Sequence, residues 1–214
     1  AESIAQALCS LVQVKLDLGD NTVSDMLAEA KALFLQSGDQ RGLAYWARLH
    51  SRWLLRQGSP RHAINWLNYA LELDLSVGYQ FYRGLTCLDL ARVHWSLGEL
   101  SQAESFAEQA LDIFSKANLP FGLASIWRML GLITTAHGKL AEAEQQLLQS
   151  IQLARQSDYK QCLAEAHLML AYVKSMQQHT SEAQNLFAIA EQIFASLPPY
   201  LDPPEMAFYQ QVRA

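Results

Sequence analysis

The chain has 214 residues, half of them apolar, and a formal net charge of −5 at pH 7. No stretch approaches the roughly 18 consecutive apolar residues that a membrane-spanning helix needs, and we expect no secretory signal, since no basic stretch followed by an apolar run opens the chain. The three cysteines are odd in number and far apart, which argues against a disulfide framework or a metal site and favours a reducing, cytoplasmic setting.

Small and apolar residues recur along the chain at steps of 40. One set of positions is nearly always alanine, a second is alanine or serine, and a third is leucine or isoleucine: Ala63, Ala103, Ala143 and Ala183; Ala70, Ala110, Ser150 and Ala190; Leu33, Leu73, Ile113, Leu153 and Ile193. A fixed period of this length predicts a solenoid, in which each unit buries its apolar face only against its neighbours.

In chain order, we expect five units over residues 1–38, 39–78, 79–118, 119–158 and 159–197. The first is one residue short, and the fifth carries Gln178 where three other units have glycine, so both should be less regular. In the third unit, a densely apolar stretch ends near Gly98, and an amphipathic pattern then runs from Ala103 to Phe114. Each unit is therefore predicted to be two antiparallel helices joined by a short turn, and the fold class is all-α.

Residues 198–214 break this pattern. Four prolines forbid a continuous helix there, and we expect a turn followed by a short capping or truncated helix. Ala1 stands directly inside a helical pattern, which favours a fragment of a longer protein. The exposed ends of such a fragment would promote self-association.

Glycine begins a recurring motif in the second helix of three units. Gly58, Gly98 and Gly138 each stand five residues before a buried small residue, as in the stretch GELSQAESFAEQAL from Gly98. This motif resembles the tetratricopeptide repeat, although the period is 40 rather than 34. The longer form is similar to repeats of bacterial transcriptional activators, peptide-pheromone sensors and animal scaffold proteins. The resemblance implies a right-handed superhelix whose first helices line a concave groove that holds ligands.

Catalytic and metal-binding motifs are missing from the sequence. It has no glycine-rich phosphate loop, no nucleophile elbow and no His-x-x-x-His pair, and its six histidines follow no repeat. We therefore predict no enzyme activity, no cofactor and no metal.

Arginines supply the strongest candidate for a binding site. Residues 41–96 hold seven arginines against three acidic residues, a local net charge of +4 in an acidic chain. Basic and aromatic residues form a line down one predicted helix at steps of three or four: Arg41, Tyr45, Arg48, Arg52 and Arg56. The repeat register adds Arg92 and Arg128 to this line, and the resemblance places Trp95 and Tyr172 on the same surface.

The predicted site for a ligand or partner is therefore Tyr45, Arg48, Arg52, Arg92, Trp95, Arg128 and Tyr172. Arginine is well suited to contacts with carboxylate and phosphate groups. The alternative is that these arginines are solvated or pair internally with Glu72, Asp89 or Glu165.

Three functions fit this surface. The first is a protein-interaction module whose groove binds an acidic peptide or partner segment. The second is a sensor or coupling domain of a larger bacterial signalling or transcriptional regulator, binding a small anionic ligand or its own neighbouring domain. The third, nucleic-acid binding, is disfavoured because the whole chain is acidic and its basic segment lacks lysine.

Overall fold

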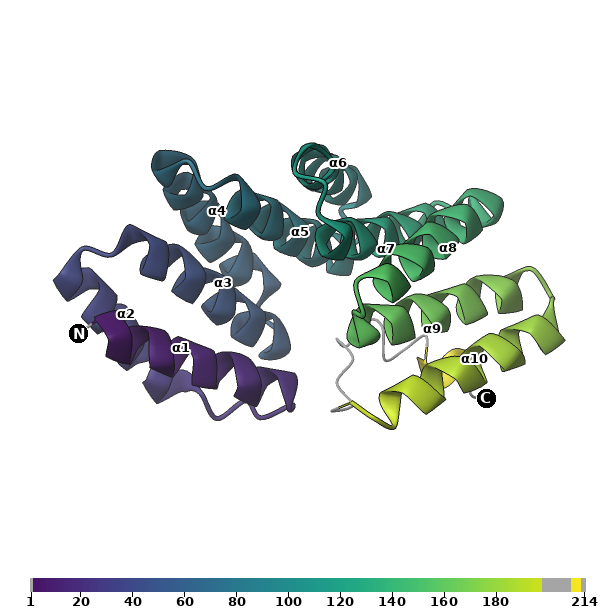
Figure 1. The fold of residues 1–214 in the computed structure, drawn as a ribbon, viewed down its shortest axis with the longest axis horizontal. Helices are drawn as coiled ribbons and strands as arrows, with labels where there is room; N and C mark the ends of the chain where they lie inside the picture. The colour runs from purple at the N-terminus through teal and green to yellow at the C-terminus, as the bar shows by residue number, and fades with distance from the viewer. Residues whose placement is uncertain (1, 198–208, 213–214) are drawn as a thin grey trace.

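A computed structural model describes residues 2–197 and 209–212 of the chain, and these residues form helices and turns without a strand. Ten helices follow one another: α1 (Glu2–Asp17), α2 (Ser24–Ser37), α3 (Gln40–Arg56), α4 (Pro60–Val77), α5 (Gln80–Ser96), α6 (Leu100–Lys116), α7 (Pro120–Ala136), α8 (Leu140–Gln156), α9 (Lys160–Met176) and α10 (Thr180–Phe194). Residues 209–212 are also helical. The helices form an arch with α1 at one end and α10 at the other (Figure 1).

The helices are arranged in tandem pairs. Only two or three residues separate most consecutive helices, so each helix must turn back against the one before it. The odd-numbered helices also contact one another, from α1 to α3 and onward to α9, and thus form a continuous layer. The predicted α-solenoid is confirmed, and its odd-numbered layer is the one that carries the arginine line.

Left-handed residues close the turns between helices. Six of the turns use glycine with φ between 69° and 78°: Gly19, Gly38, Gly58, Gly78, Gly98 and Gly138. Asn118 and Asp158 take the same role at φ 49° and 48°, and short polar side chains tolerate this region better than most. Gln178, at φ 65°, has a longer side chain that does not favour this region, so its turn is locally strained.

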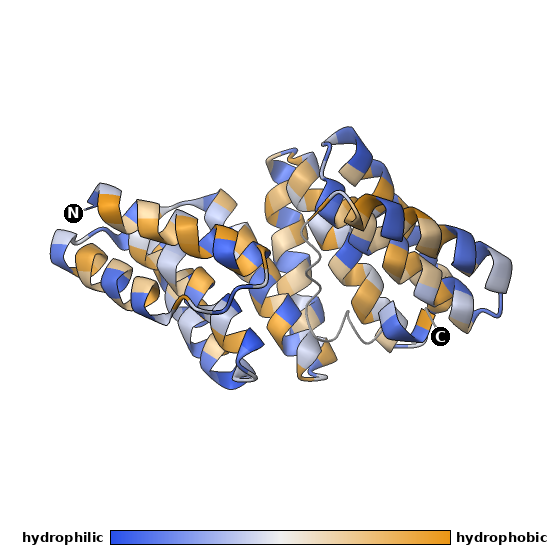
Figure 2. Cartoon of the chain, turned by 90° about the horizontal axis from the view of Figure 1, so that it is seen from below, coloured by the Kyte–Doolittle hydropathy of each residue, from blue (hydrophilic) through white to orange (hydrophobic). Residues whose placement is uncertain are grey.

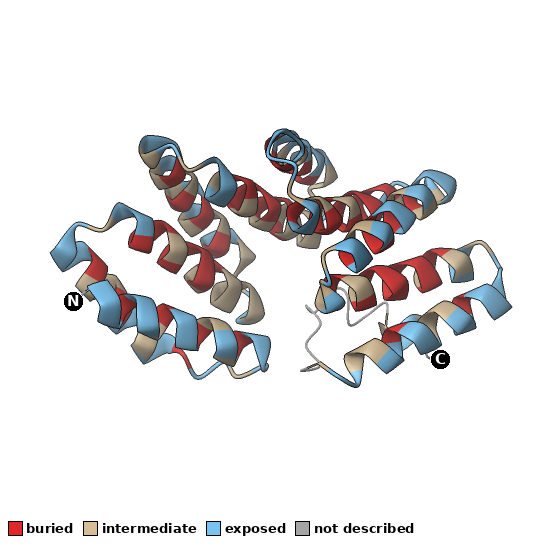
Figure 3. Cartoon of the chain, in the orientation of Figure 1, coloured by how far each residue is buried: buried red, intermediate tan, exposed pale blue. Residues whose placement is uncertain are grey.

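Small residues lie where the helices cross. Ala103 and Ala143 are fully buried, and so are Ala70 and Ala110. Because packed helices approach within roughly 8–10 Å, a small side chain at the crossing permits the close end of that range. Figure 3 shows the result, in which buried residues follow the faces that meet and exposed residues follow the outer edges.

One of these small residues is a serine, and its buried hydroxyl group has a hydrogen-bond partner. Ser150 is fully buried in the slot that alanine fills elsewhere, and its hydroxyl donates a hydrogen bond of 2.8 Å to the carbonyl oxygen of Ala124. This bond joins α8 to α7 and removes the penalty of burying an unpaired hydroxyl.

Helix α1 exposes apolar side chains on its outward face. Ile4, Leu11 and Val14 of this helix, and Leu18 directly after it, are between 44% and 62% exposed. Figure 2 shows hydrophobic residues along this helix as seen from below. Self-association through such an end stays a prediction.

The segment after α10 is described in part. The hydroxyl of Tyr209 donates to Oε1 of Glu191 at 2.9 Å, and its ring lies 5.2 Å from that of Phe187, so residues 209–212 pack on α10. The rest of the predicted proline-rich turn and capping helix falls on residues 198–208 and 213–214, outside the described residues. Among the described helices, none combines the length and apolarity needed to cross a membrane.

Candidate binding groove

The layer of odd-numbered helices encloses a groove with a cavity of 510 Å³. Its lining comes from α1, α3, α5, α7 and α9, with Leu197 at the end of the described repeat array. The lining residues follow the 40-residue register. Tyr45, Leu85, Ser125 and Glu165 occupy one slot in four successive odd-numbered helices, and all four line the cavity.

Five of the seven predicted site residues line this cavity. They are Tyr45, Arg48, Arg52, Arg92 and Arg128. Trp95 and Tyr172 are not among the lining residues. Both are half-buried, and Trp95 packs against the apolar core that α5 to α9 build. The structure thus gathers the arginines with one of the three predicted aromatic residues.

Several lining residues were missed by the sequence reading. Gln13 and Asp17 of α1 face the groove, and Phe121 and Tyr159 supply aromatic surface. Because the first unit is one residue short, a register of 39 would have aligned Gln13 with Arg52. Phe121 and Tyr159 could have been found only from their positions: Phe121 lies in the first turn of α7, and Tyr159 directly precedes α9.

Acidic side chains share the groove with the arginines. Arg52 Nη2 lies 2.8 Å from Oδ1 of Asp17, joining α3 to α1, and Arg128 Nε lies 3.2 Å from Oε2 of Glu165, joining α7 to α9. Internal pairing therefore holds for Arg128, with Glu165 as the expected partner, and for Arg52, whose partner Asp17 was not among the expected ones. Four arginines and three acidic residues line the cavity, counting Asp89, which leaves a net charge of +1.

The two ion pairs differ in how firmly they are held. The side chains of Arg52 and Asp17 are 26% and 47% exposed, so water screens this pair and its net stabilisation is small. The side chains of Arg128 and Glu165 are only 3% and 13% exposed. Arg52 is therefore available to exchange its partner for a ligand carboxylate, whereas Arg128 is fixed in the wall of the groove.

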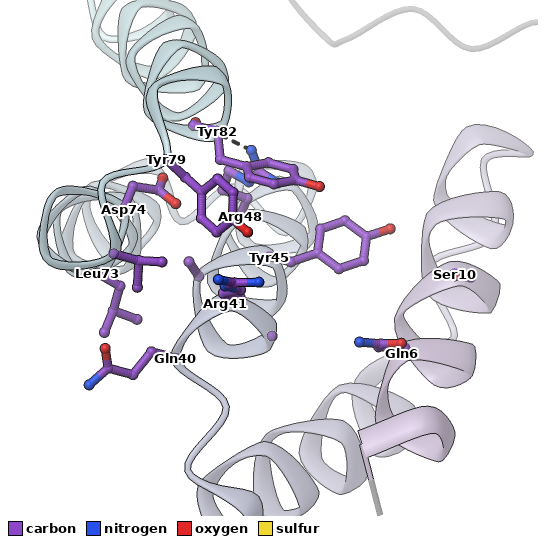
Figure 4. Close-up of a pocket in the computed structure, with 13 residues that line it drawn as sticks. Gln6, Ser10, Gln40, Arg41, Tyr45, Arg48, Leu73, Asp74, Tyr79 and Tyr82 are labelled. Carbon is purple, nitrogen blue, oxygen red and sulfur yellow. Dashed lines mark hydrogen bonds between the residues drawn. The ribbon is translucent and has the colours of Figure 1, made fainter.

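Arg48 is the most unusual cation of the site. The residue is only 6% exposed, and its Nη1 donates one long hydrogen bond of 3.4 Å to the carbonyl oxygen of Tyr82. Its guanidinium carbon lies 5.0 Å from the ring centre of Tyr82 and 5.8 Å from that of Tyr45, within the range of cation–π attraction (Figure 4). Within the described residues, Arg48 forms no ion pair with a carboxylate.

Aromatic rings form the apolar part of the groove. Phe121 and Tyr159 stack with ring centres 4.2 Å apart. Burial raises the pKa of Tyr159 to about 12, and burial also raises the pKa of Tyr45. Both phenols therefore stay neutral near pH 7, where each can donate a hydrogen bond as well as offer a ring face.

Potential metal ligands do not gather in the described part of the chain. Among residues 2–197 and 209–212, no three His, Cys, Asp or Glu side chains are placed so that they could hold a metal ion. Cys9, Cys87 and Cys162 are all buried, and burial raises the pKa of the Cys87 and Cys162 thiols to about 11. These thiols therefore remain protonated and unreactive near neutral pH.

Residues 85–118 match the tetratricopeptide repeat family. Regulatory protein AfsR of Streptomyces griseus is 28% identical over 140 residues, which are 65% of this chain and 13% of that protein. Among solved structures, a Rap protein complexed with competence and sporulation factor gives a TM-score of 0.77 at 19% identity, covering 90% of this chain and 53% of that one. BtubC (BKLC) from P. vanneervenii gives 0.67 at 18% identity, covering 92% of this chain and 82% of that one.

The fold therefore defines a class, that of α-solenoids built from tandem helix pairs. More specifically, one helix pair, within residues 85–118, matches the tetratricopeptide repeat, and the chain is similar in sequence to part of a bacterial regulatory protein. The alignment spans about an eighth of that regulator, so it concerns one region of it.

Proposed function

We propose that the groove binds a segment of a protein partner that presents acidic side chains next to an apolar one, without catalysing a reaction on it. The observation that carries this proposal is the convergence of Arg48, Arg52 and Arg92 on one cavity. The Rap protein that this fold resembles is complexed with competence and sporulation factor, which supports the use of such a solenoid for binding. A cytoplasmic location is part of the proposal.

Arg52 and Arg92 are the groups assigned to the acidic side chains. They occupy equivalent slots, 40 residues apart, on adjacent odd-numbered helices, and both line the cavity. When a carboxylate of the partner takes the place of Asp17 beside Arg52, one exposed ion pair replaces another. The free-energy cost of breaking the Arg52–Asp17 pair is therefore small. Arginine can also hold a carboxylate with two parallel hydrogen bonds, which fixes its orientation.

The stacked rings of Phe121 and Tyr159 are assigned to the apolar side chain of the partner. They line the same cavity as the arginines but lie further along the array, on the α7–α9 side. An aromatic platform beside a charged cluster gives a bound segment both a direction and a register. A segment with acidic groups at one end and an apolar anchor at the other matches this arrangement.

A peptide array tests the proposal with defined probes. Acidic peptides with one apolar anchor are compared with versions in which glutamine or lysine replaces each acidic residue, and the hits are measured by fluorescence anisotropy. The double variant Arg52→Glu/Arg92→Glu should weaken binding at least about 100-fold, because each charge-assisted contact contributes about 1.5–3 kcal/mol. Lys116→Glu on α6, whose side chain is 76% exposed, is the matched charge reversal and should bind as the parent does.

Equal binding of acidic and neutral peptides, or full binding by the double variant, would contradict the proposal. A steep loss of affinity for DNA or RNA with rising salt would instead favour nucleic-acid binding. The groove's net charge of +1 gives that alternative little support.

A second candidate occupant is a neighbouring domain of the same protein. The similarity to AfsR, a regulatory protein of which the alignment covers 13%, favours a coupling role inside a longer chain. In that case the groove residues on α3 and α5 should exchange amide hydrogens more slowly in the longer protein than in residues 1–214 alone. Unchanged exchange would exclude this occupant.

A further inference from the structure

A phenylalanine ring packs against a helix glycine at two of the junctions between repeats. Phe34 fills the space beside Gly42, and Phe114 does the same beside Gly122, where an added Cβ atom would lie 2.6 Å from the ring. Both rings are fully buried. The two phenylalanines are 80 residues apart, so one equivalent position lies between them in the sequence.

The junction between α4 and α5 departs from this pattern at both positions. Asp74 stands where the phenylalanine is expected, and Tyr82 stands where the glycine is expected. Asp74 is only 5% exposed, and its Oδ2 accepts a hydrogen bond of 2.7 Å from the hydroxyl of Thr86. Exchanging a packed ring for a buried carboxyl group weakens a fold, so packing does not account for this departure.

A pocket of 380 Å³ opens at this junction, and it lies between α1, α3, α4 and α5 (Figure 4). Arg41, Tyr45 and Arg48 of α3 point toward it, and Gln6 faces it from α1 on the other side. This volume is within the ordinary range for small-molecule sites, about 300–1,000 Å³.

Tyrosine rings hold two guanidinium groups at this pocket. The guanidinium carbon of Arg41 lies 4.4 Å from the ring centre of Tyr79, and that of Arg48 lies 5.0 Å from the ring centre of Tyr82. Within the described part of the chain, neither arginine forms an ion pair with a carboxylate. Because the rings cover guanidinium faces, the N–H groups at the edges remain suited to an anion.

We propose that this pocket binds a small organic anion, a carboxylate or phosphate carried on a ring, between Arg41 and Arg48. The ring of the ligand would take the place of the phenyl group that the repeat lacks at position 74. This site is separate from the peptide proposal, although Tyr45 and Arg48 line both cavities.

Charge decides between an anion and a cation as the ligand. Two arginines and one acidic residue line the pocket, so its net charge is +1 even with Asp74 ionised. Burial raises the pKa of Asp74, which brings the carboxyl group closer to its neutral form. The tyrosine faces that would attract an ammonium group already contact the protein's own arginines.

Calorimetric titration of the chain tests the site with four probes: phenyl phosphate, benzoate, inorganic phosphate and benzylamine. The first two should bind with saturation in the millimolar range or tighter, and comparing them separates phosphate from carboxylate. Inorganic phosphate should bind more weakly because it has no ring, and benzylamine should not bind. Arg41→Ala should weaken the two ring anions at least ~10-fold.

A double variant restores the pattern of the α2–α3 and α6–α7 junctions. Asp74→Phe/Tyr82→Gly should fill the pocket, keep or raise the melting temperature, and abolish binding of both ring anions. Arg83→Ala, a neighbouring arginine of α5 outside the pocket lining, is the matched control and should bind them normally. Arg92→Glu should also leave them bound, which distinguishes this site from the peptide groove.

Three results would overturn the proposal. They are the absence of saturable binding by either ring anion, tighter binding of benzylamine than of benzoate, and unchanged anion binding in both Arg41→Ala and the double variant. If the double variant does not fold, Arg41→Ala alone decides, since Arg41 is exposed and its replacement spares the core.

Discussion

Arg128 and Glu165 form an ion pair across the inner layer of the solenoid, with Nε 3.2 Å from Oε2 and side chains only 3% and 13% exposed. The pair links α7 to α9, two helices that are not consecutive in the chain. It therefore joins these two helices of the groove wall directly, in addition to α8, which packs against both.

Removing one partner of this pair should be strongly destabilising. Glu165→Ala leaves the guanidinium of Arg128 buried without its carboxylate, and we expect the free energy of unfolding to fall by about 3 kcal/mol in urea denaturation. Lys116→Ala removes one partner of an exposed pair on α6 and should change it by less than about 0.5 kcal/mol. If the two variants lower the free energy of unfolding equally, the buried pair stabilises the fold no more than an exposed pair does.

Larger side chains at the helix crossings should overpack the fold. Ala103 and Ala143 are fully buried, so Ala103→Leu and Ala143→Leu should each lower the free energy of unfolding by about 1–3 kcal/mol. Gln102→Leu adds a similar side chain at an exposed neighbouring position and should have a much smaller effect. Thermal melting followed by circular dichroism checks this, and three identical melting curves would refute the assignment of helix faces.

Glycine in place of Gln178 should stabilise the last repeat. Gln178 has φ 65°, a conformation that costs a residue with a Cβ about 1–2 kcal/mol. Glycine removes this cost, but its greater conformational freedom in the unfolded chain offsets part of the gain. We therefore expect Gln178→Gly to raise the free energy of unfolding by about 0.5–1 kcal/mol in urea denaturation.

The reverse exchange at an equivalent turn is the control for that prediction. Gly138 has φ 76°, and no atom lies within 4 Å of an added Cβ, so Gly138→Ala tests backbone conformation without a clash. It should destabilise the fold by about 1 kcal/mol. If Gly138→Ala leaves the free energy of unfolding unchanged, these turns do not require glycine in the left-handed conformation.

Acidification should weaken the fold before the carboxylates titrate. His167 is 3% exposed, and burial, with a smaller contribution from the charge of Arg155, lowers its pKa from 6.5 to about 4. Between pH 6.5 and 4, His167 is therefore protonated in the unfolded chain but mostly neutral in the folded chain. The stability present above pH 6.5 is lost as the pH falls toward 4. A loss of up to about 3 kcal/mol follows from that difference in pKa.

Unfolding free energies measured from pH 7.5 to 4.5 check this expectation. His167→Gln should flatten the profile, since a glutamine side chain does not titrate and can still accept a hydrogen bond from Arg155. A smaller slope should remain from His50, whose pKa burial also lowers to about 4. An unchanged slope in His167→Gln would place the titration elsewhere.

The repeat register predicted much of the site as well as the fold. Because equivalent residues of a solenoid lie side by side, the 40-residue step was enough to place Arg52 with Arg92 and Arg48 with Arg128 on one cavity. It does not by itself place Trp95, which packs against the apolar core and is not among the residues that line the cavity, so its part in the site stays a prediction. It missed Gln13 because the first unit is one residue shorter than the rest.

The sequence by itself determined the period, the helical class and the helix face that carries the arginines, since these depend on local spacing and on contacts between adjacent units. Only the tertiary structure decided which arginines are already paired. Asp17 reaches Arg52 across 35 positions of the chain, and Glu165 reaches Arg128 across 37, because the curvature of the array brings odd-numbered helices together. The pocket at Asp74 likewise depends on how Tyr82 and Arg48 pack around the space of the missing ring, and side-chain conformations of this kind are set by packing in three dimensions.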